Sequence, residues 1–365
     1  MKILDKYIVK KFLGTYFFTV AIILAIVIVF DLAEKVDDFM ESKAPFKAIV
    51  VDYYMNLVPY YANMLSPLLV FISVIFFTSK MAGQTEIIAI LSGGVSFRRL
   101  MFPYFLGAAI IAVFSFVLSS YVIPVSNRTR IHFENVYVKS KRQTGLANIH
   151  MQISPGIYVY MGRYFSTSHG GSGERGENFD IQHFEDKTLV SRLNARRVTY
   201  DSISGKWKLK DYRIWDFQPD GIRHTITTGA ELDSTINMLP SDFKKERKSF
   251  EMLTSTELVE HINELKSRNV GNTEEFIIEL YKRRATPFAS FILTLIGVSL
   301  SSRKTRGGMG VYMGIGLLLS FAFILFLTIS QTFAINGDMN PLLAVWLPNI
   351  VFSIVGIILY IKAPK

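Results

Sequence analysis

The stretch "FLGTYFFTVAIILAIVIVF", residues 12–30, contains no charged side chain in 19 residues. A helix of about 20 apolar residues crosses the roughly 30 Å of hydrocarbon in a bilayer, so this run predicts a membrane-spanning helix. Five further uncharged runs lie at residues 57–79, 100–123, 285–302, 311–335 and 341–361. Six such runs in a chain of 365 residues, half of them hydrophobic, predict a six-helix membrane protein and argue against a soluble domain.

Basic residues concentrate in the segments that join these runs on one side. With the N-terminus inside the cell, residues 1–11, 80–99, 303–310 and 362–365 carry net charges of +3, +2, +3 and +2. Lys and Arg are enriched in short cytoplasmic loops, so both termini are predicted to be cytoplasmic. This topology accounts for the chain's net charge of +10, and no nucleic-acid partner is predicted.

The long segment between the third and fourth runs is rich in short strand patterns. We expect strands in "GIYVYMGRYF" (156–165), "LNARRVTYDS" (193–202), "KWKLKDYRIWDF" (206–217) and "IRHTITTGAEL" (222–232). Many short strands separated by turns indicate a sandwich or jellyroll. The predicted fold is therefore an α-helical membrane protein with six transmembrane helices and a periplasmic all-β, jellyroll-like domain inserted between helices 3 and 4.

This fold implies four parts. They are transmembrane helices 1–3 with a cytoplasmic coupling segment at 83–100 (residues 1–123), the periplasmic β domain (124–253), a periplasmic helical connector (254–284) and transmembrane helices 4–6 (285–365).

The coupling segment, "GQTEIIAILSGGVSFRRL" (83–100), is a short apolar helix in a place where loops are normally polar. Thr85 is its expected N-terminal cap, and two glycines are expected to end it. The helix is explained either by a soluble protein that docks on it or by a position in the lipid interface. Its small residues favour the protein partner. The predicted docking residues are Thr85, Glu86, Ile87, Ala89, Ile90, Leu91, Gly93 and Gly94.

Cations also occur at the predicted outer ends of the helices, against the usual bias. They are Lys35, Lys43, Arg128, Arg130, Arg283 and Arg284. Charge-assisted contacts with an anionic lipid headgroup would explain them, and ordinary surface charge or helix capping is the alternative.

A small-residue pattern lies at the start of the fifth run, where Gly310 and Gly314 form a GxxxG with Gly316 nearby. Small residues at this spacing let two helices approach closely. The contact is either within the chain or at a seam between two protomers.

The sequence offers no motif for chemistry. It has no cysteine, its six histidines are scattered, and HExxH, GxSxG, Walker A and GxGxxG patterns are absent. The six runs contain no ionisable residue of the kind that carries protons in transporters. We therefore predict no catalytic residue, no metal site and no cofactor bound directly by the chain.

In the order of its segments the chain resembles the LptF/LptG permeases of the lipopolysaccharide-export ABC transporter. The similar stretches are "LDKYIVKKFLGTYF", which is closer to LptG, the coupling segment, "YVIPVSNRTR", "KWKLKDYRI" and "ELYKRRATPFAS". They cover essentially the whole length, in a layout of three helices, an outer domain and three helices.

The resemblance implies a non-catalytic subunit of the bacterial inner membrane. It implies a heterodimer with a related, LptF-like six-helix permease, and a cytoplasmic ABC ATPase dimer that uses ATP and docks on Thr85–Gly94. Lipopolysaccharide would enter between helix 1 of one subunit and helix 5 of the other, and pass through the jellyrolls to a periplasmic bridge protein. The family's lipid-contacting lysine aligns with Glu34, beside Lys35.

Two other classes of function stay open at this point. One is a mechanotransmitting ABC-type membrane subunit, although that class usually has four helices. The other is a membrane-anchored enzyme acting on envelope glycolipids, which would need a set of acid, base or nucleophilic residues on the outer domain.

Overall fold

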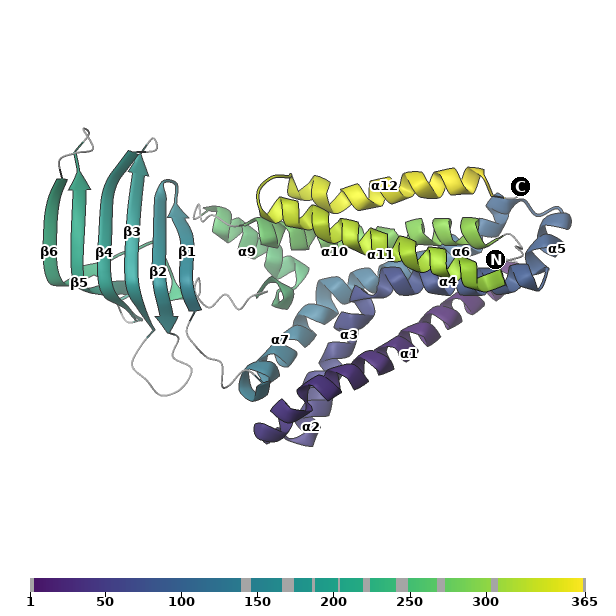
Figure 1. Cartoon of the computed structure of the whole chain (residues 1–365), viewed down its shortest axis with the longest axis horizontal. Coiled ribbons are helices and arrows are strands. Elements are labelled where there is room, and N and C mark those ends of the chain that lie inside the picture. Colours follow the sequence, from purple (N-terminus) through teal and green to yellow (C-terminus); the bar gives the residue numbers. More distant parts are fainter. Residues whose placement is uncertain are drawn as a thin grey trace. The chain divides into compact units, whose positions relative to one another are not determined.

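The structure is a computed structural model that describes residues 3–138, 146–165, 174–185, 188–202, 204–218, 224–240, 249–267, 273–302 and 308–363. It divides into two compact units (Figure 1). The helical unit comprises Met1–Lys139, Phe250–Thr256 and Glu274–Lys365, and the sheet unit comprises Ser140–Ser249 and Glu257–Thr273.

The helical unit is built from long helices interrupted by short π-helical turns. Its elements are α1 (Ile3–Glu41), α2 (Phe46–Ala48), η1 (Ile49–Tyr54), α3 (Met55–Met64), α4 (Ser66–Gly83), α5 (Glu86–Ser92), α6 (Phe97–Val117), η2 (Leu118–Val122), α7 (Ile123–Phe133), η3 (Glu134–Val138), α10 (Glu274–Ser301), α11 (Gly308–Ile335) and α12 (Pro341–Ile361). The 3-10 turn η5 spans Ser249–Met252. Among the described residues, six helical spans are long and apolar enough to cross a membrane, as the sequence predicts.

Prolines shape two of these spans. The second uncharged run of the sequence divides at Leu65 between α3 and α4, and Pro67 lies in the first turn of α4, where its missing N–H costs no helical hydrogen bond. The last span begins at Pro341, where the Asn340 side chain accepts a hydrogen bond from the Leu342 N–H. The helical segment predicted before the fourth run and that run itself form one continuous helix, α10.

Of the four hydrophobic clusters found among the described residues of the helical unit, the two largest join most of its long helices. One joins α1, α4, α5 and α6 around Phe12, Phe77 and Tyr104, and the other joins α4, α10, α11 and α12 around Phe71 and Phe323. Gly107 on α6 permits the first, because a Cβ there would lie 2.5 Å from the Phe12 ring. Close van der Waals packing of these large side chains fixes the helix pairs, because helices that associate inside a bilayer remove no apolar surface from water.

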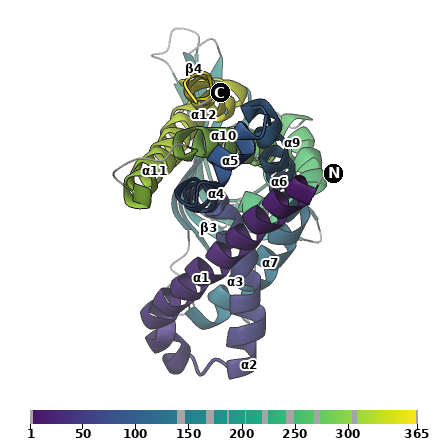
Figure 2. The ribbon, with the colours of Figure 1, turned by 90° about the vertical axis from the view of Figure 1, so that its right-hand side faces the viewer.

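The helices α1 and α11 lie at the margin of the bundle (Figures 1 and 2). In the most apolar window of each, 11% of the residues are buried in α1 and 22% in α11, compared with 72% in α4. These two helices therefore expose apolar faces that lipid or another protein has to cover.

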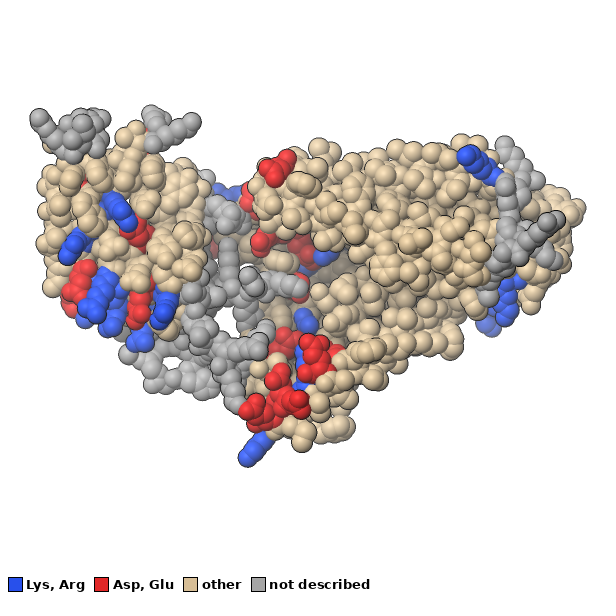
Figure 3. Space-filling model, in the orientation of Figure 1, with Lys and Arg blue, Asp and Glu red and all other residues tan. Residues whose placement is uncertain are grey.

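Charged residues gather at the ends of the helical unit and leave its sides uncharged, on the face shown in Figure 3. At the end that carries α5 and the C-terminus the described charges on this face are Lys and Arg. At the opposite end of α1 many are Asp and Glu. An uncharged band between two charged ends is the pattern expected of a membrane-spanning bundle.

The sheet unit contains one antiparallel sheet of six strands in sequential order, β1 to β6. The strands are β1 (Leu146–Ser154), β2 (Ile157–Phe165), β3 (Arg175–Glu185), β4 (Thr188–Asp201), β5 (Lys206–Phe217) and β6 (His224–Ser234). Four of them match predicted segments, and β5 has the predicted bounds. In sequence they follow the third candidate span and precede the fourth. The sequential order does not by itself confirm a jellyroll, which requires Greek-key crossovers.

One face of this sheet is apolar. Its buried centre includes Met161, Phe179 and Trp207, and the Trp207 Nε1–H donates a hydrogen bond to the Met238 carbonyl at 2.8 Å. The segment after β6 therefore covers part of this face. The helix α9 (Ser255–Ser267) follows later in the chain.

Candidate functional site

The short helix α5 forms where the coupling segment was predicted, but its start differs from the prediction. Thr85 occupies the capping position with a left-handed backbone, φ 61°, and no side-chain cap. Its hydroxyl donates instead to the Gln84 carbonyl at 2.6 Å. The expected Thr85 cap is therefore wrong, because a left-handed residue turns its side chain away from the first N–H groups. Gly94 ends the segment with φ 82°, which favours glycine.

The predicted docking residues divide between two faces of α5. Ile87 is 1% exposed and belongs to the core shared with α1, α4 and α6, and Ile90 and Leu91 pack against that core. The other face presents Ile88, which is 49% exposed, together with exposed Ala89, Gly93 and Gly94. Ile88 was not predicted as a docking residue. It could have been found, because a residue next to Ile87 is rotated by ~100° and lies on another side of the helix.

Two polar contacts fix α5 relative to the N-terminus of α1. The Tyr7 hydroxyl donates to Glu86 Oε2 at 3.3 Å. Arg99, in the first turn of α6, forms a two-pronged ion pair with buried Asp5, with 2.8 Å for each nitrogen–oxygen pair. Glu86 at the start of α5 and Arg99 shortly after its end are thus both tied to α1, which anchors the helix at both ends.

The predicted lipid-binding cation of α1, Lys35, is engaged within the chain. Its ammonium lies 2.7 Å from Asp31 Oδ1, donates to the Tyr53 hydroxyl and stands 4.8 Å from the centre of the Tyr53 ring. The Lys35 side chain is 22% exposed and that of Asp31 is 9% exposed. This cluster joins the C-terminal part of α1 to η1.

The other predicted cations differ in exposure. Arg283 is 4% exposed and donates to Glu279 Oε1, the Leu253 carbonyl and the Phe250 carbonyl. Arg130 pairs with Glu134 at 3.5 Å and covers the Tyr60 ring. Arg128 is exposed and its Nε donates to the Met252 carbonyl. Lys43 and Arg284 are exposed. The structure therefore brings Arg128 and Arg283 together on the segment 250–253.

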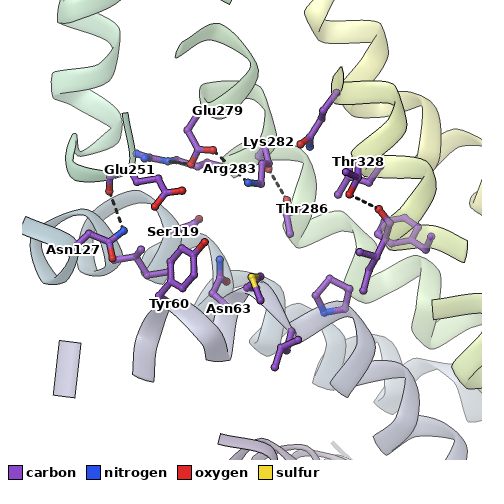
Figure 4. A pocket seen from close by; sticks show the side chains of 18 residues that line it. Tyr60, Asn63, Ser119, Asn127, Glu251, Glu279, Lys282, Arg283, Thr286 and Thr328 are labelled. Atoms are coloured by element: carbon purple, nitrogen blue, oxygen red, sulfur yellow. Dashed lines mark hydrogen bonds and ion pairs between the residues drawn. The ribbon is translucent and has the colours of Figure 1, made fainter. Parts of the chain in front are cut away.

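A cavity of about 320 Å³ lies within the helical unit, between α3, α4, η2, α7, α10 and α11 (Figure 4). Its polar lining comprises Tyr60, Asn63, Ser119, Asn127, Glu251, Glu279, Lys282, Arg283, Thr286, Thr328 and Gln331. Its apolar lining comprises Met64, Leu65, Pro67, Ile123, Phe323, Ile324 and Leu327. A cavity that is polar on one side and apolar on the other matches the two chemistries of an amphiphile.

Lys282, which precedes the predicted cations Arg283 and Arg284 in one basic run, lines this cavity beside Glu279 at 3.4 Å. Asn127 is fully buried and donates to the Glu251 carbonyl at 3.3 Å, which closes the polar side of the cavity. In the sequence, the basic run Lys282-Arg283-Arg284 is the signal that points to this part of the cavity. Successive residues of a helix are rotated by ~100°, so these three side chains lie in different environments.

The three glycines of α11 have different roles. A Cβ at Gly316 would collide with the Ile75 side chain, so Gly316 packs within the chain against α4. A Cβ at Gly310 or Gly314 would meet no atom within 4 Å. The GxxxG pair therefore lies open on the surface of α11.

The open face of α11 continues along the helix as large exposed side chains. They include Leu318, Phe321, Leu325 and Phe333. On α1 a comparable face includes Phe18, Ile26, Val29 and Phe30. Both faces are apolar for several turns, as a surface covered by lipid or by a second membrane subunit requires.

Among the described residues no group of three or more His, Asp or Glu side chains is placed to hold a metal ion. The helical unit offers the anchored helix α5 at one end, an amphipathic cavity, and two open apolar helix faces. This combination suits a protein that binds and moves an amphiphile together with other subunits.

Comparisons with known proteins agree with this architecture. No curated protein matches the chain. The family described as lipopolysaccharide export system permease LptF/LptG matches residues 6–362, which is nearly the whole chain. With six candidate membrane spans and a match over this length, the chain is a member of the LptF/LptG family of lipopolysaccharide export permeases, multi-pass proteins of the inner membrane.

Proposed function

We propose that this chain is the non-catalytic membrane subunit that couples ATP hydrolysis, carried out by a separate cytoplasmic ABC ATPase dimer, to extraction of lipopolysaccharide from the outer leaflet of the inner membrane. The observation that carries this proposal is the exposed face of α5, formed by Ile88, Ala89, Gly93 and Gly94. A helix anchored by Ile87 and presenting a small apolar face transmits force from a docked protein to α1 and α6.

The charge pattern supports the orientation that this coupling needs. With the positive segments facing the cytoplasm, both termini and α5 would lie on the cytoplasmic side and the sheet unit on the periplasmic side. The sheet unit is then on the side where a periplasmic bridge protein can receive the lipid.

The open faces of α1 and α11 support a second, LptF-like permease as partner. The GxxxG pair on α11 lets a neighbouring helix approach closely there. Lipopolysaccharide would enter laterally between α1 of one subunit and α11 of the other, and acyl chains would find apolar walls along both helices. A mechanotransmitting subunit is a weaker alternative, since six spans exceed the four usual in that class.

Headgroup contacts would come from cations with exposed charge. Lys43, Arg128 and Arg284 are exposed, and Lys282 lines the amphipathic cavity, so these four are the ligands we favour. Lys35 and Arg283 would act mainly by shaping the outer end of the bundle, because their side chains are only 22% and 4% exposed, compared with 45% for Lys282.

A pull-down of tagged protein from native membranes tests the coupling proposal. Ile88→Arg places a charge on the exposed face of α5, and Ile3→Arg is the control, because Ile3 is 90% exposed at the N-terminal end of α1. We expect a cytoplasmic ATPase to accompany the wild type and the Ile3 variant, with at least tenfold less in the Ile88 variant. If no ATPase accompanies a folded, membrane-inserted wild type, the proposal fails.

A further inference from the structure

The face of the sheet opposite its apolar core carries two complete cross-strand rows of mostly polar and aromatic residues. The first row is Gln152, Tyr158, Gln182, Arg192, Trp215 and Ile226, and the second is His150, Tyr160, Asp180, Asn194, Arg213 and Thr228. Side chains alternate between the faces of a sheet, so Val159, Phe179 and Ile181 point into the core while their neighbours form these rows.

Asp180 is the centre of a fixed polar network on this face. The residue is 4% exposed. It accepts hydrogen bonds from Arg192 Nε at 2.8 Å, from Gln182 Nε2 at 3.1 Å and from Asn194 Nδ2 at 3.3 Å. A buried carboxylate held by three donors from its own and the neighbouring strand is rigid, and it orients the carbonyl oxygens of both amides.

Aromatic rings stand around this network. Tyr158 is 47% exposed and meets the Phe184 ring edge-on at 5.8 Å. Tyr160 stacks obliquely on His150 at 4.7 Å, and its hydroxyl donates to Asn148 Oδ1 at 3.0 Å. The Arg192 guanidinium lies 5.9 Å from the Trp215 ring. Each ring is held by a neighbour, so little side-chain entropy is lost when a ligand covers it.

These residues border a depression of about 440 Å³ within the sheet unit. It is lined by His150, Met151, Tyr158, Val159, Tyr160, Asn178, Asp180, Gln182, Arg192 and Asn194. Its volume falls in the range of small-ligand sites, about 300–1,000 Å³.

We infer that this depression binds a saccharide. The apolar C–H face of a sugar ring fits an exposed aromatic ring, while its hydroxyls pair with amide, carboxylate and guanidinium groups that both donate and accept. The structure provides this combination in Tyr158 and Tyr160 beside Gln182, Asn194 and Asn178.

The same chemistry disfavours the other parts of a glycolipid. An acyl chain over this floor would cover the amides of Asn178, Gln182 and Asn194 without offering them hydrogen bonds, which costs ~1–3 kcal/mol for each group left unpaired. A phosphate would compete with Asp180 for Arg192, the one basic side chain other than His150 in the lining. A neutral, polyhydroxylated ligand can form hydrogen bonds with the amides and does not compete with Asp180 for Arg192.

The family name supplies the source of such a ligand, since a lipopolysaccharide carries sugars as well as lipid. The identity of that source rests on the proposed function. The site itself rests on the geometry of the sheet unit. On this inference, the polar face of the sheet holds the sugar part of the lipopolysaccharide.

Binding of a lipid-free saccharide to the full-length protein in detergent micelles tests the inference. The probe is the oligosaccharide released by mild acid from the bacterium's own lipopolysaccharide, detected by saturation-transfer NMR and titration calorimetry. Tyr158→Ser and Gln182→Ala are expected to weaken binding at least tenfold, and Asp180→Asn by a similar factor. Ile226→Ser is the control on the same face outside the depression, because Ile226 is 54% exposed, and it should change binding less than twofold.

Three outcomes would overturn the inference. They are absence of saturation transfer with the wild type, equal binding by the wild type and the Tyr158 and Gln182 variants, and displacement of the probe by 10 mM inorganic phosphate, on the order of the concentration at which a weak anion site fills. The ATPase pull-down separates this result from the proposed function. A chain that retains its ATPase but binds no oligosaccharide overturns only the saccharide site.

Discussion

Arg99 at the start of α6 holds Asp5 near the start of α1 through two parallel contacts of 2.8 Å. The pair connects residues 94 positions apart. The Asp5 carboxylate is almost fully buried, while the guanidinium of Arg99 is partly exposed. A planar guanidinium matches a carboxylate in this geometry, so the contact sets orientation as well as distance. It fixes α1 beside the segment that follows α5.

Removal of this guanidinium should loosen α1. Arg99→Ala leaves the buried Asp5 carboxylate without its two donors, and we expect a loss of about 1–3 kcal/mol. Asp5→Asn should cost less, because a neutral amide tolerates burial better than an isolated charge. Thermal unfolding in detergent measures both, and Arg98→Ala, at an exposed neighbouring position, serves as the control. Equal midpoints for the Arg98 and Arg99 variants would contradict this role.

Adjacent arginines on α10 allow a second matched comparison. Arg283→Ala removes three hydrogen bonds from a buried cation to Glu279 and to the carbonyls of Leu253 and Phe250. We expect a loss of ~3–5 kcal/mol, as for other broken buried ion pairs. The segment around Glu251 should also become accessible to a glutamate-specific protease. Arg284→Ala, at an exposed position, should change neither the stability nor the cleavage.

The protease result decides whether Arg283 has the structural role proposed here. If Arg283→Ala leaves cleavage at Glu251 unchanged and instead reduces crosslinking of lipopolysaccharide more than Lys282→Gln does, Arg283 is a direct lipid ligand. In that case the prediction from sequence, which placed Arg283 among the headgroup contacts, is the correct one.

The elements that the sequence predicts well are those whose pattern is local. The strand at Lys206–Phe217 alternates over "KWKLK", and the helix at Pro341–Ile361 is uninterrupted and begins at a proline. The strand β3 was missed because "RGENFDIQHFE" has only three large apolar residues, and two of its polar ones, Asp180 and Gln182, find their partners on that strand and on β4. Local hydrophobicity carries no information about that network.

The site was predictable only at the level of segments. The position of α5 follows from its apolar run, but its division into a buried and an exposed face depends on the packing of α1, α4 and α6. The same limit applies to Arg283, whose acceptors Phe250 and Leu253 lie 33 and 30 positions away. From the sequence, the charge of Arg283 is assigned to a lipid ligand. In the folded chain, backbone carbonyl groups from a distant segment accept hydrogen bonds from it instead.

The proposed orientation can be mapped with single cysteines, because the chain contains none. Ser92→Cys, on the exposed side of α5, should react with a membrane-impermeant maleimide only after the cytoplasmic face is opened. Asp338→Cys, between α11 and α12, should react from the periplasm in intact spheroplasts. The cysteine-free wild type gives the background. Reaction of Ser92→Cys in intact spheroplasts would invert the topology and remove the basis for ATPase docking on α5.

The two kinds of glycine on α11 provide the test of the subunit seam. Gly316→Leu forces a side chain against Ile75, and we expect overpacking to cost ~1–3 kcal/mol in the isolated chain. Gly314→Leu meets open space, and leucine favours a helix over glycine by ~0.5–1 kcal/mol, so the isolated chain should lose no stability.

Association with the second permease should be affected in the opposite order, more by Gly314→Leu than by Gly316→Leu. If a helix of the second permease approaches the GxxxG surface, Gly314→Leu should reduce co-purification of that permease at least fivefold while the chain remains folded. A Gly314 variant that still assembles fully would mean that lipid covers this face, because a flexible acyl chain can adapt to a leucine and a close-packed helix cannot.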